Sequence, residues 1–194
     1  MFSKSLIAAA LLATTLTTQF ASAAGIPPAT GVKPVQSFVM PLEGDADGYS
    51  ANFGHTFLAA DAGKSFTDRF TFTVGSLDLT TGSLTSKPLG TQDLYISSFN
   101  VYSATGALVV TGINNTPNSN ATGKMDLWAL PVSTILGSGN YYLQVTGQVL
   151  GKNSSYASEM TLAPVPEPET YAMLLGGLGL IGAVARRRAA KKAA

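Results

Sequence analysis

The chain has 194 residues, no cysteine, one histidine and a formal net charge of +1. The lack of cysteine excludes disulfides, thiol catalysis, thiolate-bound zinc and a lipoprotein anchor, which needs a cysteine at its cleavage site. A single histidine excludes a histidine-rich metal site, so we expect no metal and no cofactor.

The first residues have the order of charge, apolar run and small side chains that is typical of a secretory signal peptide. Lys4 supplies the charge, the apolar stretch covers residues 6 to about 16, and residues 21–23 (Ala-Ser-Ala) form a small-x-small cleavage site. We therefore predict a signal helix over residues 1–23 and a mature chain that begins at Ala24. The alternative, a buried amphipathic helix, fits this order of residues poorly.

Residues 24–163 are predicted to form one domain, which is long enough to bury a core. This segment carries six basic and nine acidic side chains, a net charge of −3. A mildly acidic domain without a basic patch argues against nucleic acid as a partner. A proline-rich lead-in covers residues 24–36, and a stiff, proline-rich tether begins at residue 164.

Within this domain, short runs rich in Phe, Tyr, Val, Ile and Thr alternate with Gly, Asn, Ser and Asp. This pattern is typical of an all-β sandwich or barrel. The expected strands cover residues 36–42, 51–60, 66–75, 92–102, 107–113, 125–130, 140–149 and 154–162. We predict an antiparallel, jelly-roll-like β-sandwich, while the order of its strands stays open.

An acidic turn lies early in the domain, at residues 43–48 (EGDADG). Its Asp-x-Asp-Gly core is superficially similar to a calcium loop, but no glutamate closes a 12-residue loop behind it. We expect an ordinary turn, and a weak calcium site at Asp45 and Asp47 is the alternative.

The most informative strand covers residues 66–74, because side chains alternate between the two faces of a strand. Asp68 shares its face with Phe66 and Phe70, whereas the other face is polar. The carboxylate therefore points into the core, where it is costly unless it is hydrogen-bonded or paired. We expect a partner such as the backbone N–H groups of a turn or the single histidine, His55.

Asp68 has two interpretations. In the structural one, the buried carboxylate fixes a loop to the sheet, and His55 is a structural histidine. In the functional one, Asp68 is an acid–base residue with a raised pKa, and together with His55 it serves a hydrolase. The structural interpretation is favoured because the sequence has no second carboxylate at a fixed spacing and no serine elbow. The hydrolase alternative requires both side chains to meet in an open cleft.

Aromatic side chains with a polar tip suit sugar ligands, although core packing explains most aromatics in a β domain equally well. On the strand over residues 140–149, Tyr142 and Gln144 share one face, and Tyr141, Leu143 and Val145 share the other. The second face is the core face, so Tyr142 is the better candidate for contact with a ligand. A carbohydrate-binding module is therefore an alternative function.

A short apolar run, residues 172–185, lies near the end of the chain. As a helix it is about 21 Å long at ~1.5 Å per residue, against ~30 Å for a bilayer core. Tyr171 at one interface and snorkelling arginine stems at the other extend its reach. We expect a short transmembrane helix that is stopped on the cytoplasmic side by a basic cluster, Arg186, Arg187 and Arg188.

A proline-rich triplet precedes this run and consists of Pro166, Glu167 and Pro168. The order of triplet, apolar helix and arginine cluster, behind a signal peptide, resembles the PEP-CTERM sorting signal of exported Gram-negative proteins; we assign it to residues 164–192. The resemblance implies that an exosortase, a membrane protease, recognises the triplet and cuts at or near it. The precursor is then held transiently in the inner membrane before its domain is released or transferred to an acceptor.

The Phe-x-Asp-x-Phe pattern of residues 66–70 is similar to the signature of one PEP-CTERM subgroup. The resemblance implies a non-catalytic protein of the cell surface or extracellular matrix, in a family whose members accompany exopolysaccharide and biofilm systems. We therefore expect no enzymatic activity, and we expect exopolysaccharide as a partner beside the exosortase.

Overall fold

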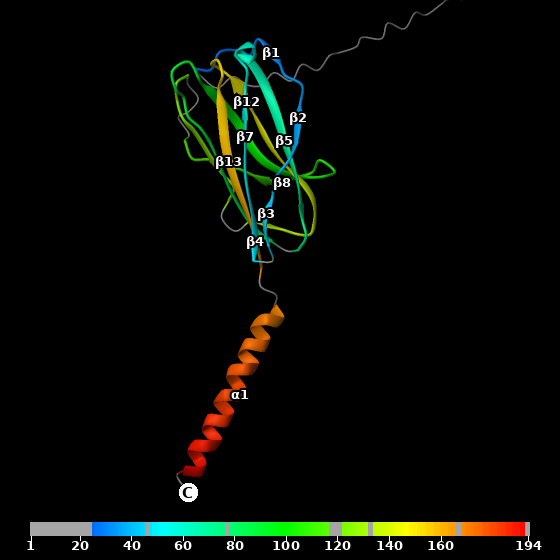
Figure 1. Ribbon diagram of the computed structural model, residues 1–194, viewed down its shortest axis with the longest axis vertical. Coiled ribbons are helices and arrows are strands. Elements are labelled where there is room, and N and C mark those ends of the chain that lie inside the picture. Colours follow the sequence, from blue (N-terminus) through cyan, green and yellow to red (C-terminus); the bar gives the residue numbers. More distant parts are fainter. Residues whose placement is uncertain are drawn as a thin grey trace, which may run out of the picture.

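The computed structural model describes residues 25–45, 47–76, 78–116, 122–131, 134–165 and 168–192. Within these residues the chain forms two β-sheets packed face to face and one C-terminal helix (Figure 1). The predicted signal peptide, residues 1–23, lies outside the described residues, and so do Pro166 and Glu167 of the predicted triplet.

The first sheet has the strand order β1-β5-β12-β7-β8, and β2 also pairs with β5. Its strands are β1 (Gly31–Val32), β2 (Gln36–Val39), β5 (Lys64–Val74), β7 (Leu94–Ser103), β8 (Leu108–Thr111) and β12 (Gly139–Val149). β1 and β2 run parallel to β5, so the prediction of antiparallel pairing is wrong for these two strands. Parallel neighbours need a crossover connection, and the chain makes it here through two strands of the other sheet before it returns as β5.

The second sheet has the strand order β3-β4-β13-β6-β10-β9, and β11 also pairs with β6. Its strands are β3 (Glu43–Asp45), β4 (Gly48–Thr56), β6 (Asp78–Ser86), β9 (Ile113–Asn114), β10 (Asp126–Ala129), β11 (Thr134–Leu136) and β13 (Ser155–Pro164). All the strand pairs of this sheet within the described residues are antiparallel, which confirms the prediction for this sheet. A short 3₁₀ helix, η1 (Ala59–Asp61), replaces the end of the strand predicted over residues 51–60.

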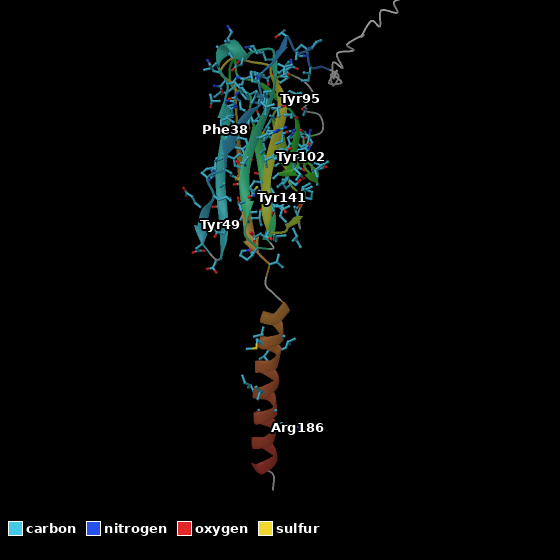
Figure 2. The ribbon with its side chains drawn as sticks, turned by 90° about the vertical axis from the view of Figure 1, so that its right-hand side faces the viewer. Phe38, Tyr49, Tyr95, Tyr102, Tyr141 and Arg186 are labelled. Atoms are coloured by element: carbon cyan, nitrogen blue, oxygen red, sulfur yellow. The ribbon has the colours of Figure 1, made fainter. Side chains whose placement is uncertain are left out.

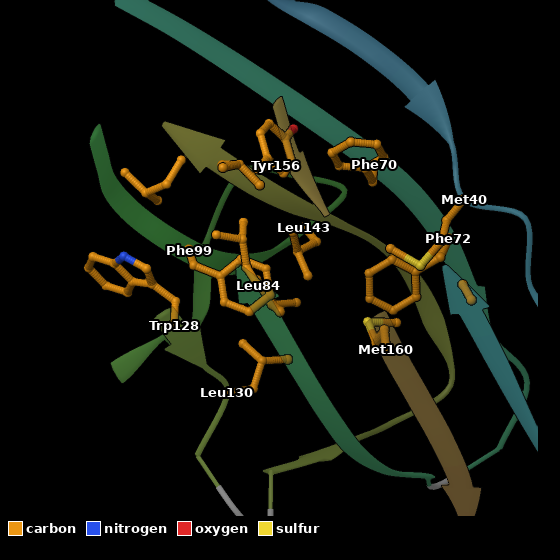
Figure 3. Close-up of a cluster of buried hydrophobic side chains, with 14 of the residues drawn as sticks. Met40, Phe70, Phe72, Leu84, Phe99, Trp128, Leu130, Leu143, Tyr156 and Met160 are labelled. Carbon is orange, nitrogen blue, oxygen red and sulfur yellow. The ribbon is translucent and has the colours of Figure 1, made fainter. Parts of the chain in front are cut away.

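The core lies between the two sheets and is formed by alternate residues of their strands (Figure 3). Phe70 and Leu143 from the first sheet and Leu84 and Met160 from the second are at most 2% exposed. Burying a large apolar side chain stabilises a fold by about 1.5–3 kcal/mol. Since the chain has no disulfide, this apolar layer is the main stabilising feature of the sandwich.

Helix α1 (Pro168–Lys192) follows the sandwich. Met173, Leu174 and Leu180 on this helix are 60–79% exposed. No helix among the described residues combines the length and the apolar character that a membrane crossing requires. The helix over the predicted sorting segment is thus present, and its insertion in a membrane stays a prediction.

The two ends of the sandwich are distinct. At one end, which we call the tethered end, β13 ends at Pro164. The connections β3–β4, β5–β6 and β11–β12 also lie at this end. We call the far end the opposite one, at which β5 begins, β6 ends and β12 turns into β13. Figure 2 shows Tyr49 at the tethered end, nearer to α1, and Tyr95 towards the far end.

Candidate functional sites: a buried polar cluster, two charged ends and a C-terminal segment

Asp68 lies at the centre of a polar cluster that joins the two sheets. Its side chain, on β5, is fully buried, and its Oδ2 atom lies 2.7 Å from Nδ1 of His55 on β4. The same Oδ2 accepts a hydrogen bond of 2.7 Å from the hydroxyl group of Tyr156 on β13. One carboxylate therefore connects a strand of the first sheet to two neighbouring strands of the second, and both candidate residues, Asp68 and His55, meet there.

The surroundings of this carboxylate favour a protonated phenol. Burial, the negative charge of Asp68 and the hydrogen bond to it raise the pKa of Tyr156. Tyr156 thus remains a hydrogen-bond donor to Asp68 over the whole physiological pH range. The His55 ring packs between Phe38 and Phe57, with ring centroids 5.4 and 4.3 Å away.

His55 is the most exposed member of the cluster: its side chain is 19% exposed against 1% for that of Asp68. A hollow of about 590 Å³ beside it is lined by residues 52–56 and 155–157, Thr85 and Lys87. Asp68 does not line this hollow. Face alternation in the sequence pointed to Asp68, and His55 was the candidate partner because it is the single histidine. Nothing in the sequence gave Tyr156 a place in this cluster. The available signal is that Tyr156 shares the buried face of β13 with Ser158 and Met160.

Tyr142, the predicted ligand contact, lies on the outer face of the first sheet and is half-buried. Tyr102 on β7 stacks against its ring with centroids 5.2 Å apart, and the Arg69 guanidinium on β5 lies 4.9 Å from the ring centroid. Arg69 also donates from Nε to Gln144 Oε1 at 3.0 Å. Because β5 and β7 flank β12 on opposite sides, protein groups engage this ring from both directions. A hollow of about 550 Å³ beside it is lined mainly by apolar side chains, including Val39.

The acidic turn forms the connection between β3 and β4, and Asp45 and Asp47 are exposed. The backbone N–H of Asp47 donates to Asp45 Oδ1 at 2.9 Å, which is the hydrogen bond of an ordinary Asx turn. No group of three or more His, Cys, Asp or Glu side chains in the described part of the chain could hold a metal ion. The weak calcium site at this turn stays an alternative.

The far end gathers most of the basic side chains of the domain. Lys64 begins β5, Lys87 follows β6, Lys124 precedes β10, and Lys152 lies between β12 and β13. Lys33 joins them, because its backbone N–H donates to Ser65 O at the start of β5. Five of the six bases of residues 24–163 therefore meet at one end, although they are far apart in the sequence. Composition alone gave no sign of this concentration.

Two of these lysines form ion pairs, and the other three form none with the residues that the structure describes. Lys33 and Lys64 bind the two carboxylate oxygens of Asp61, which is 7% exposed. The hydrogen bond from Lys33 holds the pKa of Asp61 below its usual value of 3.8, against the opposing effect of burial. The remaining three far-end lysines are exposed: Lys87, Lys124 and Lys152.

Asp93 organises the far end. Its Oδ2 accepts the backbone N–H of Gly123 at 2.7 Å, and its backbone oxygen accepts that of Gly151 at 2.9 Å. These bonds fix the loops that carry Lys124 and Lys152 to one residue. Burial raises the pKa of the Asp93 carboxyl group because it desolvates the charged form.

The tethered end has the opposite charge. Glu43, Asp45 and Asp47 are exposed there, and Asp78 is buried at the same end, at the start of β6. β13 ends there at Pro164, which pairs with Asp78, and α1 begins at Pro168. Arg186, the described member of the predicted arginine cluster, lies exposed on α1 (Figure 2).

Comparison with known proteins gives one match by family. Residues 164–188 match the family model of the PEP-CTERM protein-sorting motif. No curated protein sequence is similar enough to count as a relative.

Two solved structures share distant similarity with the chain, each at 14% identity over 66% of it. One is the pre-peptidase C-terminal domain of a collagenase from Bacillus anthracis, of which 95% is covered at a TM-score of 0.37. The other is PliG from Aeromonas hydrophila, a periplasmic inhibitor of g-type lysozyme, of which 99% is covered at a TM-score of 0.34. TM-scores this low do not indicate a shared fold. The family match does not depend on these two structures. It shows that residues 164–188 of the chain carry the PEP-CTERM motif of exported proteins that are processed at the membrane.

Proposed function

We propose that this protein is an exported, non-catalytic protein of the cell surface or extracellular matrix. A signal peptide over residues 1–23 delivers it, α1 holds the precursor in the inner membrane with Arg186, Arg187 and Arg188 on the cytoplasmic side, and an exosortase processes it at Pro166, Glu167 and Pro168. The observation that carries this proposal is the sorting motif at residues 164–188, which begins at the last residue of β13.

A structural role for Asp68 and His55 supports the non-catalytic part of the proposal. The rival hydrolase needs both side chains in an open cleft, whereas Asp68 is fully buried and its Oδ2 is engaged by His55 and Tyr156. Buried polar groups that are hydrogen-bonded in this way tie the elements of a core into one arrangement. The Phe-x-Asp-x-Phe pattern then serves the fold, because Phe66 and Phe70 are buried on either side of Asp68.

The placement of charge supports an anionic exopolysaccharide as the partner. Lys87, Lys124 and Lys152 are exposed at the end of the sandwich that lies opposite the tether. A concentration of one sign of charge attracts a polymer of the other sign, even on a domain whose net charge is negative. The alternative, a carbohydrate-binding module built on stacking at Tyr142, is less well supported because Tyr102 and Arg69 already engage that ring.

The domain is further proposed to be a jelly roll. Four strands of one sheet follow the order β4-β13-β6-β10, and four of the other follow β5-β12-β7-β8. From β4 to β7 each connection crosses from one sheet to the other, and so does the connection from β12 to β13. This interleaving of two four-stranded layers supports a pair of Greek keys.

Replacing the triplet tests the processing step. We expect the variant with Pro166→Ala, Glu167→Ala and Pro168→Ala to accumulate as a membrane-bound precursor, with mature protein at least about tenfold below the parent level. The matched control carries Pro27→Ala and Pro28→Ala in the lead-in and should be processed normally. Immunoblotting of membrane and medium fractions measures the precursor and the mature protein. Normal processing of the triplet variant would contradict the proposed role of the triplet.

A further inference from the structure

The strand that leads into the sorting segment is a central one. β13 pairs with β4 along residues 155–162 and with β6 along residues 157–164. The last of these pairs joins Pro164 to Asp78. The end of β13 therefore cannot leave the sandwich without breaking a ladder with a neighbouring strand.

The connection between this strand and the helix is short. Only residues 165–167 separate Pro164, the end of β13, from Pro168, the first residue of α1. A fully extended chain spans at most about 3.6 Å per residue, so Pro164 and Pro168 lie no more than about 14 Å apart. Any protease that holds the triplet in its cleft has to come that close to the folded domain.

From this geometry we propose that the tethered end of the sandwich is a contact surface for the exosortase during cleavage. This inference rests on the proposed processing of the chain and adds the surface that the protease meets. The surface consists of Gly48, the first residue of β4, and of the connections beside the end of β13 that carry Ser76 and Ser138. Gly48 belongs there because a Cβ atom at this position would lie 2.9 Å from Leu162 O on β13.

The far end takes no part in this contact. β13 has ten residues at about 3.3 Å each, which puts the start of the strand about 33 Å from the tether.

The pairing of β13 within the sheet also limits the position of the cut. A protease cleft binds its substrate as an extended segment, and residues 155–164 are already paired within the sheet, so the mature C-terminus lies at Val165 or beyond.

Two insertions at opposite ends of one strand test the contact. An insertion of eight Gly and Ser residues after Ser138, just before β12, enlarges the tethered end; the same insertion after Lys152, just beyond β12, enlarges the far end. Both positions are exposed. We measure the rate of precursor processing by pulse–chase in cells that contain the exosortase, and thermal unfolding by circular dichroism shows that each variant folds.

We expect the insertion after Ser138 to slow processing at least fivefold and the insertion after Lys152 to change it less than twofold. A second pair of variants carries, in addition, a twelve-residue Gly/Ser spacer between Val165 and Pro166. The spacer separates the protease from the domain, so it should restore the rate of the Ser138 variant to within twofold of the spacer-only chain.

Equal rates for the two insertions would overturn the inference, and so would a defect of the Ser138 variant that persists with the spacer. In both cases the parent chain is still processed and the proposed function stands. If the parent chain itself is not processed by the exosortase, the proposed function fails as well.

Discussion

Asp68 shows how one side chain can connect two sheets. Its carboxylate is buried, and its Oδ2 lies within hydrogen-bond distance of His55 Nδ1 and accepts the Tyr156 hydroxyl; both residues are on neighbouring strands of the opposite sheet. Removing a partner from a buried polar cluster leaves the remaining groups without water and without a hydrogen bond. The cluster therefore contributes more to stability when complete than any one of its hydrogen bonds suggests.

Truncation of this carboxylate should destabilise the domain strongly. We expect Asp68→Ala to lower the free energy of unfolding by about 2–4 kcal/mol and Tyr156→Phe, which removes one hydroxyl group, by about 1–2 kcal/mol. Urea denaturation of the isolated variants measures both. The control is Glu159→Ala, which removes an exposed carboxylate and should cost less than about 0.5 kcal/mol. An Asp68→Ala variant as stable as this control would contradict the structural role.

Asp61 makes stability depend on pH. Because the hydrogen bond from Lys33 depresses the pKa of this carboxyl group below 3.8, its contribution is present above about pH 4. It is lost as the pH falls through the lowered value. We expect the parent to be more stable than Asp61→Asn by about 1 kcal/mol at pH 7, and the gap to be smaller at pH 2. Urea denaturation at both pH values measures it, and a gap that does not change with pH would contradict this account.

At the scale of elements, face alternation was a sufficient signal for some strands but not for others. β5 follows the predicted pattern of buried Phe66, Phe70 and Phe72. β6 was not predicted at all, although it lies between β13 and β10. Its sequence, DLTTGSLTS, has two leucines among Ser, Thr and Gly, which is the composition of a loop. Thr80 and Ser86 are nevertheless buried, and β6 pairs with β13 and β10. The strand conformation of β6 therefore depends on these neighbouring strands more than on its own side chains.

Sequence also could not reveal which strands lie side by side. The parallel pairing of β1 and β2 with β5 and the assembly of Tyr156 with Asp68 and His55 depend on contacts between residues far apart in the chain. The Asp68–His55 contact could be anticipated only because the chain has a single histidine and a buried carboxylate needs a partner.

The bulge in the β12–β7 ladder, where Ser97 of β7 is the extra residue, lies beside a glycine of β12. The register between β12 and β7 shifts between Thr146 and Gly147, and a Cβ atom at Gly147 would lie 2.2 Å from Tyr95 O and 2.9 Å from the Phe66 ring. We expect Gly147→Ala to lower the free energy of unfolding by at least about 2 kcal/mol. Gly137→Ala is the control, because no heavy atom lies within 4 Å of its Cβ position, and it should cost less than about 0.5 kcal/mol. Equal denaturation midpoints for the two variants would contradict this packing.

At the scale of the whole molecule, charge is separated along the sandwich. Exposed lysines lie at the far end, and the exposed acids of the β3–β4 connection lie beside the tether. The lysines are dispersed in the sequence from residue 33 to residue 152, so it is the order of the strands that brings them to one end. In the proposed function, processing removes the membrane segment from the tethered end, and the basic end lies on the opposite side of the sandwich from the cut.

This separation predicts where an anionic polysaccharide binds. We expect the variant with Lys87→Gln, Lys124→Gln and Lys152→Gln to lose about tenfold in affinity for a polyuronate, because each exposed charge contributes up to about 1 kcal/mol. Binding should also weaken as salt rises. The control, Tyr142→Ala, should bind like the parent in the same titration. Loss of binding in Tyr142→Ala alone would favour the carbohydrate-binding module instead, and stronger binding to duplex DNA than to the polyuronate would point to a different partner.

The central claim is that the C-terminal segment sorts the domain out of the cell and is then removed. The most direct measurement is the intact mass and the cell fraction of the mature protein from its native host, with and without the exosortase. The account predicts a chain that starts at Ala24 and ends near Pro166, found in the medium or matrix only when the enzyme is present. A chain that keeps Arg186, Arg187 and Arg188 and stays in the inner membrane, with or without the enzyme, would contradict it.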